Sequence, residues 1–342
     1  MLKSLQMGRG FAALWVAGFH LAGACAILPG SSVIATLFRH GNAGVDFFFA
    51  LSGFIILFAH ANDIGCPERL PRYLRRRFVR VYPVYWVYSA VVIAAVLLGL
   101  SRVPLTSSLL GWVSNVTLVS VASAPPPISV AWTLFFEVAF YAAFATLIVN
   151  RWLGLAVFSA WLALVVGFHT EVVADNLHFL WTSRLSQNFF AGMAAYLLHK
   201  RLSKSLAVVA LVGGAGLLIG AIAMYDHGLF PGLFGSLVSV SSAALIAGAA
   251  ALERGRIWNL GPLTALGDAS YTIYLTHVHI QAPLMRLLKP TGINVDVLFV
   301  GVLGATVLAG YGLYLVIERP ILRALSGSRP GLQAGLKSIA QT

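Results

Sequence analysis

Long apolar segments recur along the whole chain, separated by short stretches in which polar and basic residues concentrate. Most segments are about 16 to 25 residues long, close to the ~20 residues that a helix needs to cross the hydrocarbon core of a bilayer. The pattern predicts an all-α, polytopic integral membrane protein with about ten transmembrane helices in one bundle. We expect the spans at 11–29, 44–59, 80–100, 132–149, 152–168, 185–199, 205–224, 232–252, 266–285 and 295–317.

Two stretches need separate interpretation. Residues 105–122 are more polar than the other segments and lead into Pro125–Pro127, so we expect an interfacial or re-entrant piece on the outer side. At the N-terminus, basic residues before an apolar run that ends in Cys25 resemble a secretory signal with a lipoprotein-like cleavage site. Because His20 interrupts that run and further apolar segments follow, we expect the segment to be retained.

Composition supports the membrane assignment. Hydrophobic residues make up 59% of the chain and charged residues 10%, whereas soluble domains carry about a quarter charged residues. The net charge of +12 would suit nucleic-acid binding, but the basic residues are scattered between apolar runs, so we expect no nucleic-acid partner. With Cys25 and Cys66 as the only cysteines, neither a disulfide framework nor a cysteine metal site is predicted.

The distribution of Lys and Arg predicts the orientation, because cytoplasmic loops carry an excess of these residues. With the N-terminus inside, eighteen of the 23 lie on the inner side and five on the outer side. An even number of spans then places both termini in the cytoplasm. We expect one membrane domain at 1–325 and a short, basic, flexible cytoplasmic tail at 326–342.

Arg9 and His20 are the first candidates for chemistry. Eleven residues at about 100° each bring both side chains to one face of a helix, roughly 16 Å apart along its axis. An arginine at the mouth of a membrane helix and a histidine near mid-bilayer suggest a site that binds an anion at the surface and moves a proton deeper in. A buried His20 that hydrogen-bonds a neighbouring helix is the alternative.

A cluster of arginines that includes Arg76, Arg77 and Arg80 precedes the third span. Arginines three apart at the start of a helix share a face, and planar guanidinium groups bind phosphate oxygens well. The Tyr82-Pro83 pair directly after them predicts a turn or kink. An ordinary cytoplasmic loop against anionic lipid is the alternative, but a phosphorylated donor such as a coenzyme A thioester would suit the cluster.

Carboxylates inside apolar spans are costly unless they have a partner or face a wet cavity. Asp46 lies near the outer end of the second span, where a helix N-terminus would also favour a carboxylate. Glu137 lies inside the fourth span, where it would form a structural salt bridge or share a polar cavity with His20. Ser52 and Gly53 allow close helix packing, and that is the simpler interpretation of Gly53.

The ninth span carries Tyr271, Tyr274 and His277, of which the last two are neighbours on one helical face. Together with Ser52 these side chains are candidates to line a cavity or to contact an acceptor. The last span ends in Glu318-Arg319-Pro320, where the charged pair is consistent with an interfacial anchor.

Taken together, six motifs resemble those of the membrane acyltransferase-3 family, in particular the bacterial exopolysaccharide and lipopolysaccharide O-acetyltransferases. Each motif alone is weak, but all six occur in the right order over most of the 342 residues. They are Arg9 with His20, Gly44 to Phe54, Arg77 and Arg80 before Tyr82-Pro83, Trp132 to Tyr141, Leu266 to Tyr271 leading to His277, and Glu318-Arg319-Pro320.

The resemblance implies a ten-helix enzyme of the bacterial inner membrane that moves an acyl group, most simply acetyl. It also implies an acyl-coenzyme A donor from the cytoplasm, a glycan hydroxyl acceptor on the outer side and no permanently bound cofactor. The family residues tied to activity match Arg9, His20, Arg77 and Arg80. The extra helix and the esterase-like domain that some members append have no counterpart here, which leaves the delivery of the acceptor open.

The implied mechanism has Arg77, Arg80 and Arg9 hold the donor's phosphates. His20 then deprotonates the sugar hydroxyl or accepts the acyl group itself, and Glu137 or Asp46 orients the imidazole. Expected partners are the acyl-coenzyme A, a polysaccharide, lipopolysaccharide or lipid-linked sugar, and membrane lipid, and a homo-oligomer is compatible with the sequence. A glycan or anion transporter would use the same groups as a pathway, and a structural partner of a polysaccharide synthase would not depend on His20.

Overall fold

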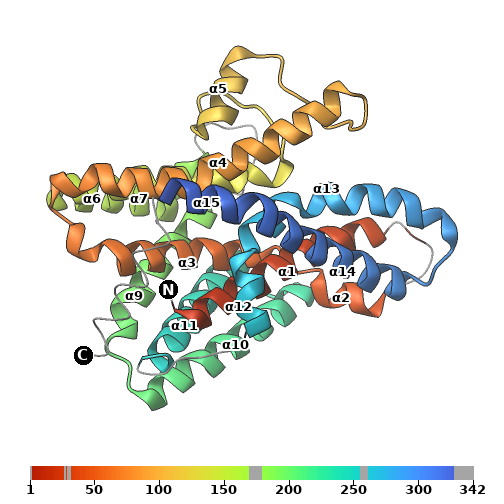
Figure 1. Ribbon diagram of the computed structural model, residues 1–342. Helices are drawn as coiled ribbons and strands as arrows, with labels where there is room; N and C mark the ends of the chain where they lie inside the picture. Colours follow the sequence, from red (N-terminus) through yellow and green to blue (C-terminus); the bar gives the residue numbers. More distant parts are fainter. Residues whose placement is uncertain (1, 27, 29–31, 169–178, 255–260, 327–342) are drawn as a thin grey trace, which may run out of the picture.

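The computed structural model describes residues 2–26, 28, 32–168, 179–254 and 261–326, and every regular element that it assigns there is a helix (Figure 1). The predicted all-α fold class is therefore confirmed. The tail predicted at 326–342 lies outside the described residues from 327 onward.

Each of the ten predicted spans contains at least one helix. The α-helices are α1 (Lys3–Cys25), α2 (Val33–Phe38), α3 (Ala43–His60), α4 (Leu70–Leu97), α5 (Leu109–Thr117), α6 (Trp132–Val149), α7 (Arg151–Phe168), α8 (Phe179–Thr182), α9 (Gln187–His199), α10 (Lys204–Asp226), α11 (Phe234–Leu252), α12 (Gly261–Asp268), α13 (Ser270–Leu288), α14 (Val295–Leu313) and α15 (Arg319–Ser326). A π-helical turn, Tyr314–Glu318, joins α14 to α15.

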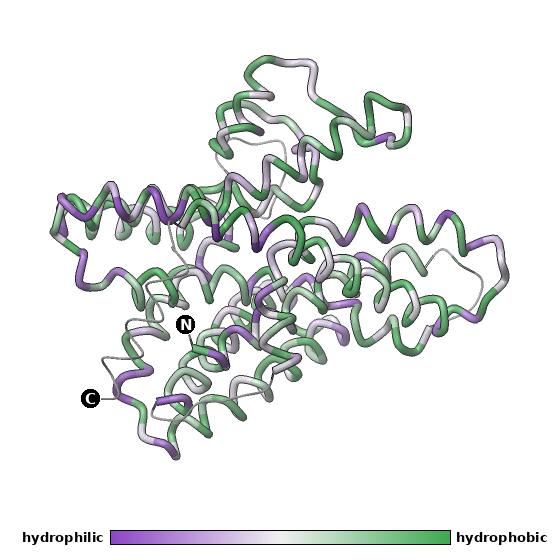
Figure 2. Tube along the Cα trace, in the orientation of Figure 1, coloured by the Kyte–Doolittle hydropathy of each residue, from purple (hydrophilic) through white to green (hydrophobic). Residues whose placement is uncertain are grey.

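Seven helical segments of the described chain are long and apolar enough to cross a membrane. They have apolar bodies, and hydrophilic positions gather at helix ends and along the first turns of α4 (Figure 2). The predicted spans at 11–29 and 185–199 are not among the seven, so the predicted count of ten is not confirmed. Helix α1 has 23 residues, but polar side chains such as Arg9 and His20 lower its mean hydropathy. Helix α9 has 13 residues, and a helix of that length is about 20 Å long, shorter than the ~30 Å hydrocarbon core. The predicted span at 266–285 is divided between α12 and α13, which meet at Ala269.

Helix α1 lies at the centre of the molecule and contacts α2, α3, α11, α12, α13 and α14 (Figure 1). It begins eight residues before the predicted span, so Arg9 lies within the helix rather than ahead of it. Glu253, directly after α11, fixes this early start. Its carboxylate accepts hydrogen bonds from the backbone N–H of Lys3 and Ser4 and from the Ser4 hydroxyl, which satisfies free donors at the helix N-terminus.

Helices α3 and α9 pack with their backbones in close contact. A Cβ atom on Gly192 would overlap the carbonyl oxygen of Ala50, and one on Gly53 would overlap that of Phe189. The interpretation of Gly53 as a packing residue is therefore confirmed. Around this crossing the core is aromatic, with the Phe189 ring stacked on Phe140 at a centroid distance of 4.4 Å.

Helix α4 begins ten residues before the predicted span and carries the arginine cluster on its first turns. Pro83 lies inside α4, so the expected turn does not end the helix there. The polar stretch predicted to be interfacial or re-entrant contains the short helix α5, which protrudes from the bundle beside the second half of α4 (Figure 1). Tyr82, Tyr85 and Trp86 fasten it by donating to backbone carbonyls of Thr117, Asn115 and Val116.

Candidate active site

A cavity of about 1170 Å³ opens between α1, α3, α4, α6, the end of α12, α13, the π-helical turn and α15. Among the described residues that line it, eight arginines stand against three carboxylates, Glu137, Asp268 and Glu318. The arginines are Arg9, Arg72, Arg75, Arg76, Arg77, Arg80, Arg319 and Arg323. Such an excess of guanidinium groups in a partly enclosed space favours a multiply charged anion with phosphate-like oxygens.

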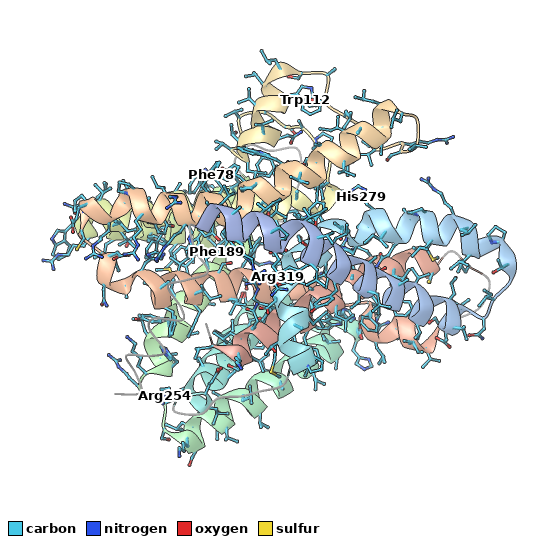
Figure 3. All side chains as sticks on the ribbon, in the orientation of Figure 1. Phe78, Trp112, Phe189, Arg254, His279 and Arg319 are labelled. Atoms are coloured by element: carbon cyan, nitrogen blue, oxygen red, sulfur yellow. The ribbon has the colours of Figure 1, made fainter. Side chains whose placement is uncertain are left out.

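The cluster is formed by two helices that are distant in sequence. Arg75 on α4 donates to the carbonyl oxygen of Leu325 on α15, so the basic residues of the two helices lie along the same cavity. Arg319, labelled in Figure 3, begins α15 and lines this cavity. The expected donor arginines Arg76, Arg77 and Arg80 all line it, together with Arg319 and Arg323, which the sequence did not single out as donor ligands.

Arg77 and Arg80 have different surroundings. The Arg77 guanidinium lies 5.6 Å from the ring centroid of Tyr141 and 6.0 Å from that of Tyr73, and its buried Nε has no hydrogen-bond partner. In the described chain no carboxylate lies within ion-pair distance of Arg77. Arg80 instead lies 3.5 Å from Glu318 and 5.4 Å from the centroid of the Tyr271 ring. Arg77 is therefore the more available cation.

Arg9 enters the same cavity from α1. Helix α1 can approach α12 closely because Gly10 faces the α12 backbone, where an added Cβ would lie 3.0 Å from Gly267 N. Within the described ranges Arg9 has neither a hydrogen-bond nor an ion-pair partner. The predicted convergence of Arg9 with Arg77 and Arg80 is thus present in the fold.

The carboxylates are distributed differently from the expectation. Glu137 lines the cavity and accepts a hydrogen bond from the Tyr141 hydroxyl. Asp46 is buried away from the cavity lining, where its Oδ1 accepts a hydrogen bond of 2.7 Å from Asn188 Nδ2. No described contact joins either carboxylate to His20. The structure therefore does not show the predicted orientation of the His20 imidazole by Glu137 or Asp46.

Glu318 is the carboxylate that the sequence interpretation missed. It is fully buried, not an interfacial anchor, and its Oε2 accepts hydrogen bonds from Thr272 Oγ1 at 2.6 Å and from Thr272 N at 3.2 Å. The π-helical turn ends at this residue. The sequence did contain a signal for a buried Glu318, because a carboxylate directly follows an apolar span. The adjacent Arg319 and Pro320 instead favoured an interpretation as a helix end at the membrane surface.

His20 lies outside the cavity lining and is exposed on α1. Its Nδ1 lies 3.2 Å from Nε2 of His277, a fully buried residue of α13. His277 was expected to line a cavity or contact an acceptor, and the structure makes it the neighbour of His20. The two ring centroids are 4.9 Å apart.

Tyr274 lies between the cavity and the histidine pair. Its side chain lines the cavity, and its ring centroid is 5.9 Å from that of His277. Its hydroxyl donates to the carbonyl of Val130, which holds the ring against the start of α6. Tyr271 and Ser52 also line the cavity, as expected, and the Tyr271 hydroxyl donates to the carbonyl of Val81.

Comparison with known proteins gives a family and a relative. The family described as "Acyltransferase domain" matches residues 2–315. The chain is 31% identical over 298 residues to the exopolysaccharide production protein ExoZ of Rhizobium meliloti (strain 1021), an alignment that covers 84% of this chain and 91% of the relative. No solved structure matches the chain.

Proposed function

The chain belongs to this family of membrane acyltransferases, and from that premise we propose that it transfers an acyl group, most simply acetyl, from cytoplasmic acyl-coenzyme A to a hydroxyl of an exported polysaccharide. The name of the relative, an exopolysaccharide production protein, supports a glycan acceptor. A bacterial inner-membrane location with the donor side in the cytoplasm belongs to the same proposal.

The observation that carries the choice of donor is the arginine-lined cavity. Coenzyme A presents several phosphate groups, and each charge-assisted hydrogen bond from a guanidinium contributes about 1.5 to 3 kcal/mol. Arg9 and Arg77, which have no hydrogen-bond or ion-pair partner in the described part of the chain, are available for such contacts without breaking an existing ion pair. Arg80, which is paired with Glu318, is the third arginine proposed to bind the donor's phosphates.

The histidine supplies the proton chemistry. In a direct transfer, His20 takes the proton of the acceptor hydroxyl as its oxygen attacks the thioester carbonyl carbon. A carbon–oxygen bond forms, the carbon–sulfur bond breaks, and the leaving thiolate takes the proton from the imidazolium. In the two-step alternative, His20 first holds the acyl group and then passes it to the hydroxyl.

The test is coenzyme A release by the purified protein with acetyl-coenzyme A and a polysaccharide acceptor. The wild type should release coenzyme A and acetylate the glycan, whereas His20→Gln should lower transfer by about 10² to 10⁴, the usual contribution of a general base. His227→Gln, in an exposed position after α10, is the matched control and should keep wild-type activity. A chain that moves a glycan without acylating it would release no coenzyme A, and that result would contradict the proposal.

A further inference from the structure

The protonation of His277 follows from the backbone around it. Its Nδ1 lies 2.7 Å from the carbonyl oxygen of Tyr274 and 3.2 Å from that of Ile273. Carbonyl oxygens only accept hydrogen bonds, so Nδ1 must carry a hydrogen. The side chain is 0% exposed, and no described carboxylate or cation contacts it. A buried imidazole without a counter-ion is neutral, so its Nε2 carries a lone pair.

The same reasoning extends to His20. Its Nδ1 faces two acceptors, Nε2 of His277 at 3.2 Å and the carbonyl oxygen of Val16 at 3.1 Å. Because neither can donate, Nδ1 of His20 carries the hydrogen. Nε2 of the neutral ring is then left with the lone pair, on a side chain that is exposed while its partner is buried.

We propose that His277 is a positioning residue that, together with the carbonyl oxygen of Val16, holds His20 in the Nδ1–H tautomer and so keeps Nε2 ready as base or nucleophile. This inference rests on the proposed function for its catalytic meaning. When Nε2 of His20 takes the hydroxyl proton, Nδ1–H continues to donate to Nε2 of His277, and the proton on Nε2 leaves with the thiolate. His277 remains neutral throughout.

A neutral acceptor has a physical advantage at this place. A buried carboxylate would orient the imidazole as well, but its charge would have to be desolvated within the bundle. The backbone carbonyls of Ile273 and Tyr274 fix the His277 tautomer with no added charge. This explains how His20 can be oriented although Asp46 and Glu137 contact other residues.

A second polar contact keeps α1 and α13 in register next to the pair. Gln281, one turn beyond His277, is buried and donates from Nε2 to the carbonyl oxygen of Ala17 at 2.9 Å. Among the described hydrogen bonds, none joins Gln281 to either imidazole. Gln281→Leu therefore weakens the docking of the two helices without removing the acceptor for His20, and it serves as the matched control.

The experiment compares His277→Leu, which removes the acceptor, with His277→Gln, whose amide oxygen can replace it. We expect His277→Leu to lower kcat by about tenfold to a thousandfold, part of the ~10² to 10⁴ that a positioned base contributes, with donor KM unchanged. The pH of half-maximal kcat should fall, because the imidazolium of His20 loses one of its two hydrogen-bond acceptors. His277→Gln should recover most of kcat, and Gln281→Leu should keep the wild-type pH profile.

A spectroscopic readout separates this inference from the proposed function. In protein labelled with ¹⁵N-histidine, His20 should have a bare Nε2 and a protonated Nδ1 in the wild type and in His277→Gln. In His277→Leu only the Val16 carbonyl remains as acceptor, so a measurable share of the Nε2–H tautomer should appear. If the wild type transfers no acyl group, the proposed function fails, while this pattern of tautomers would still support the positioning role. A single Nδ1–H tautomer or an unchanged kcat in His277→Leu would overturn it.

Discussion

At the scale of single residues, two pairs of identical side chains differ in their roles because their neighbours differ. Arg77 is held by two tyrosine rings, whereas Arg80 is paired with a buried carboxylate. His20 is exposed and His277 is fully buried. The donor contacts and the proton chemistry therefore depend on the surroundings of each side chain and not on residue type alone.

We expect Arg77→Ala to raise the donor KM about tenfold to a hundredfold, because a charge-assisted contact of about 1.5 to 3 kcal/mol is lost. Arg77→Lys should recover only part of the affinity, since an ammonium group cannot form the bidentate contact. Steady-state kinetics at varied acyl-coenzyme A concentration measure both effects.

The control for this change is Arg151→Ala. Arg151 also lies over an aromatic ring, 4.9 Å from the centroid of Trp152, but it does not line the cavity. Its substitution should leave the donor KM unaltered. An Arg77→Ala enzyme with wild-type donor dependence would mean that the α4 cluster contacts lipid and not the donor.

At the scale of elements, glycines decide how closely helices approach. Gly53 and Gly192 bring α3 against α9, and Gly10 brings α1 against α12. The α3–α9 contact supports the aromatic core around Phe189. The α1–α12 contact helps to position Arg9 at the cavity. Small residues at such crossings let backbones pack closely where the surrounding lipid provides no hydrophobic driving force.

Gly192→Ala should lower the stability of the folded protein by about 1 to 3 kcal/mol, because the added Cβ would overlap the Ala50 carbonyl and separate α3 from α9. The midpoint of thermal unfolding in detergent measures the change. Donor KM of the protein that remains folded should be unaffected, since α9 does not line the cavity.

Gly216→Ala in α10 is the matched control, because a Cβ there has no atom within 4 Å. In the absence of a clash, alanine is favoured over glycine in a helix by up to ~1 kcal/mol, so the midpoint should stay or rise. Equal losses from both substitutions would argue against the close α3–α9 packing.

At the scale of the whole molecule, the arginine cavity and the histidine pair lie at two positions along one central helix. Arg9 and His20 are about 16 Å apart on α1 at ~1.5 Å per residue, and Tyr274 lies between the cavity and the pair. A donor bound by its phosphates would have to extend its thioester arm past Tyr274. This arrangement would suit the proposed transfer from a donor on one side of the membrane to an acceptor on the other.

The proposed orientation in the membrane predicts the labelling of Cys66, which lies between the short 3₁₀ helices Ala61–Asp63 and Pro67–Arg69, next to the start of α4. In a Cys25→Ser background, a membrane-impermeant thiol reagent should leave Cys66 unlabelled in intact cells and label it in inside-out vesicles. Cys66 is only partly buried, so denaturation is not required. Labelling in intact cells would place the arginine cavity on the outer side and exclude a cytoplasmic donor.

The sequence alone determined where along the chain helices form. Each of the ten apolar segments contains a helix, because hydropathy and helical period are local properties of the chain. The gathering of Arg9, Arg77 and Arg80 was also predictable, since the motifs resembled those of the family. The bounds of α1 and α4 were not, because Glu253 and the arginine-rich first turn extend these helices beyond their apolar parts.

Only the tertiary structure decided which polar groups meet. Glu318 lies 238 residues from Arg80, and His20 lies 257 residues from His277. No local pattern encodes such pairs, since they depend on the order and rotation with which helices pack. The sequence suggested Glu137 and Asp46 as partners of His20 because carboxylates commonly orient imidazoles. In the packed structure Glu137 instead contacts Tyr141, Asp46 contacts Asn188, and His20 contacts His277.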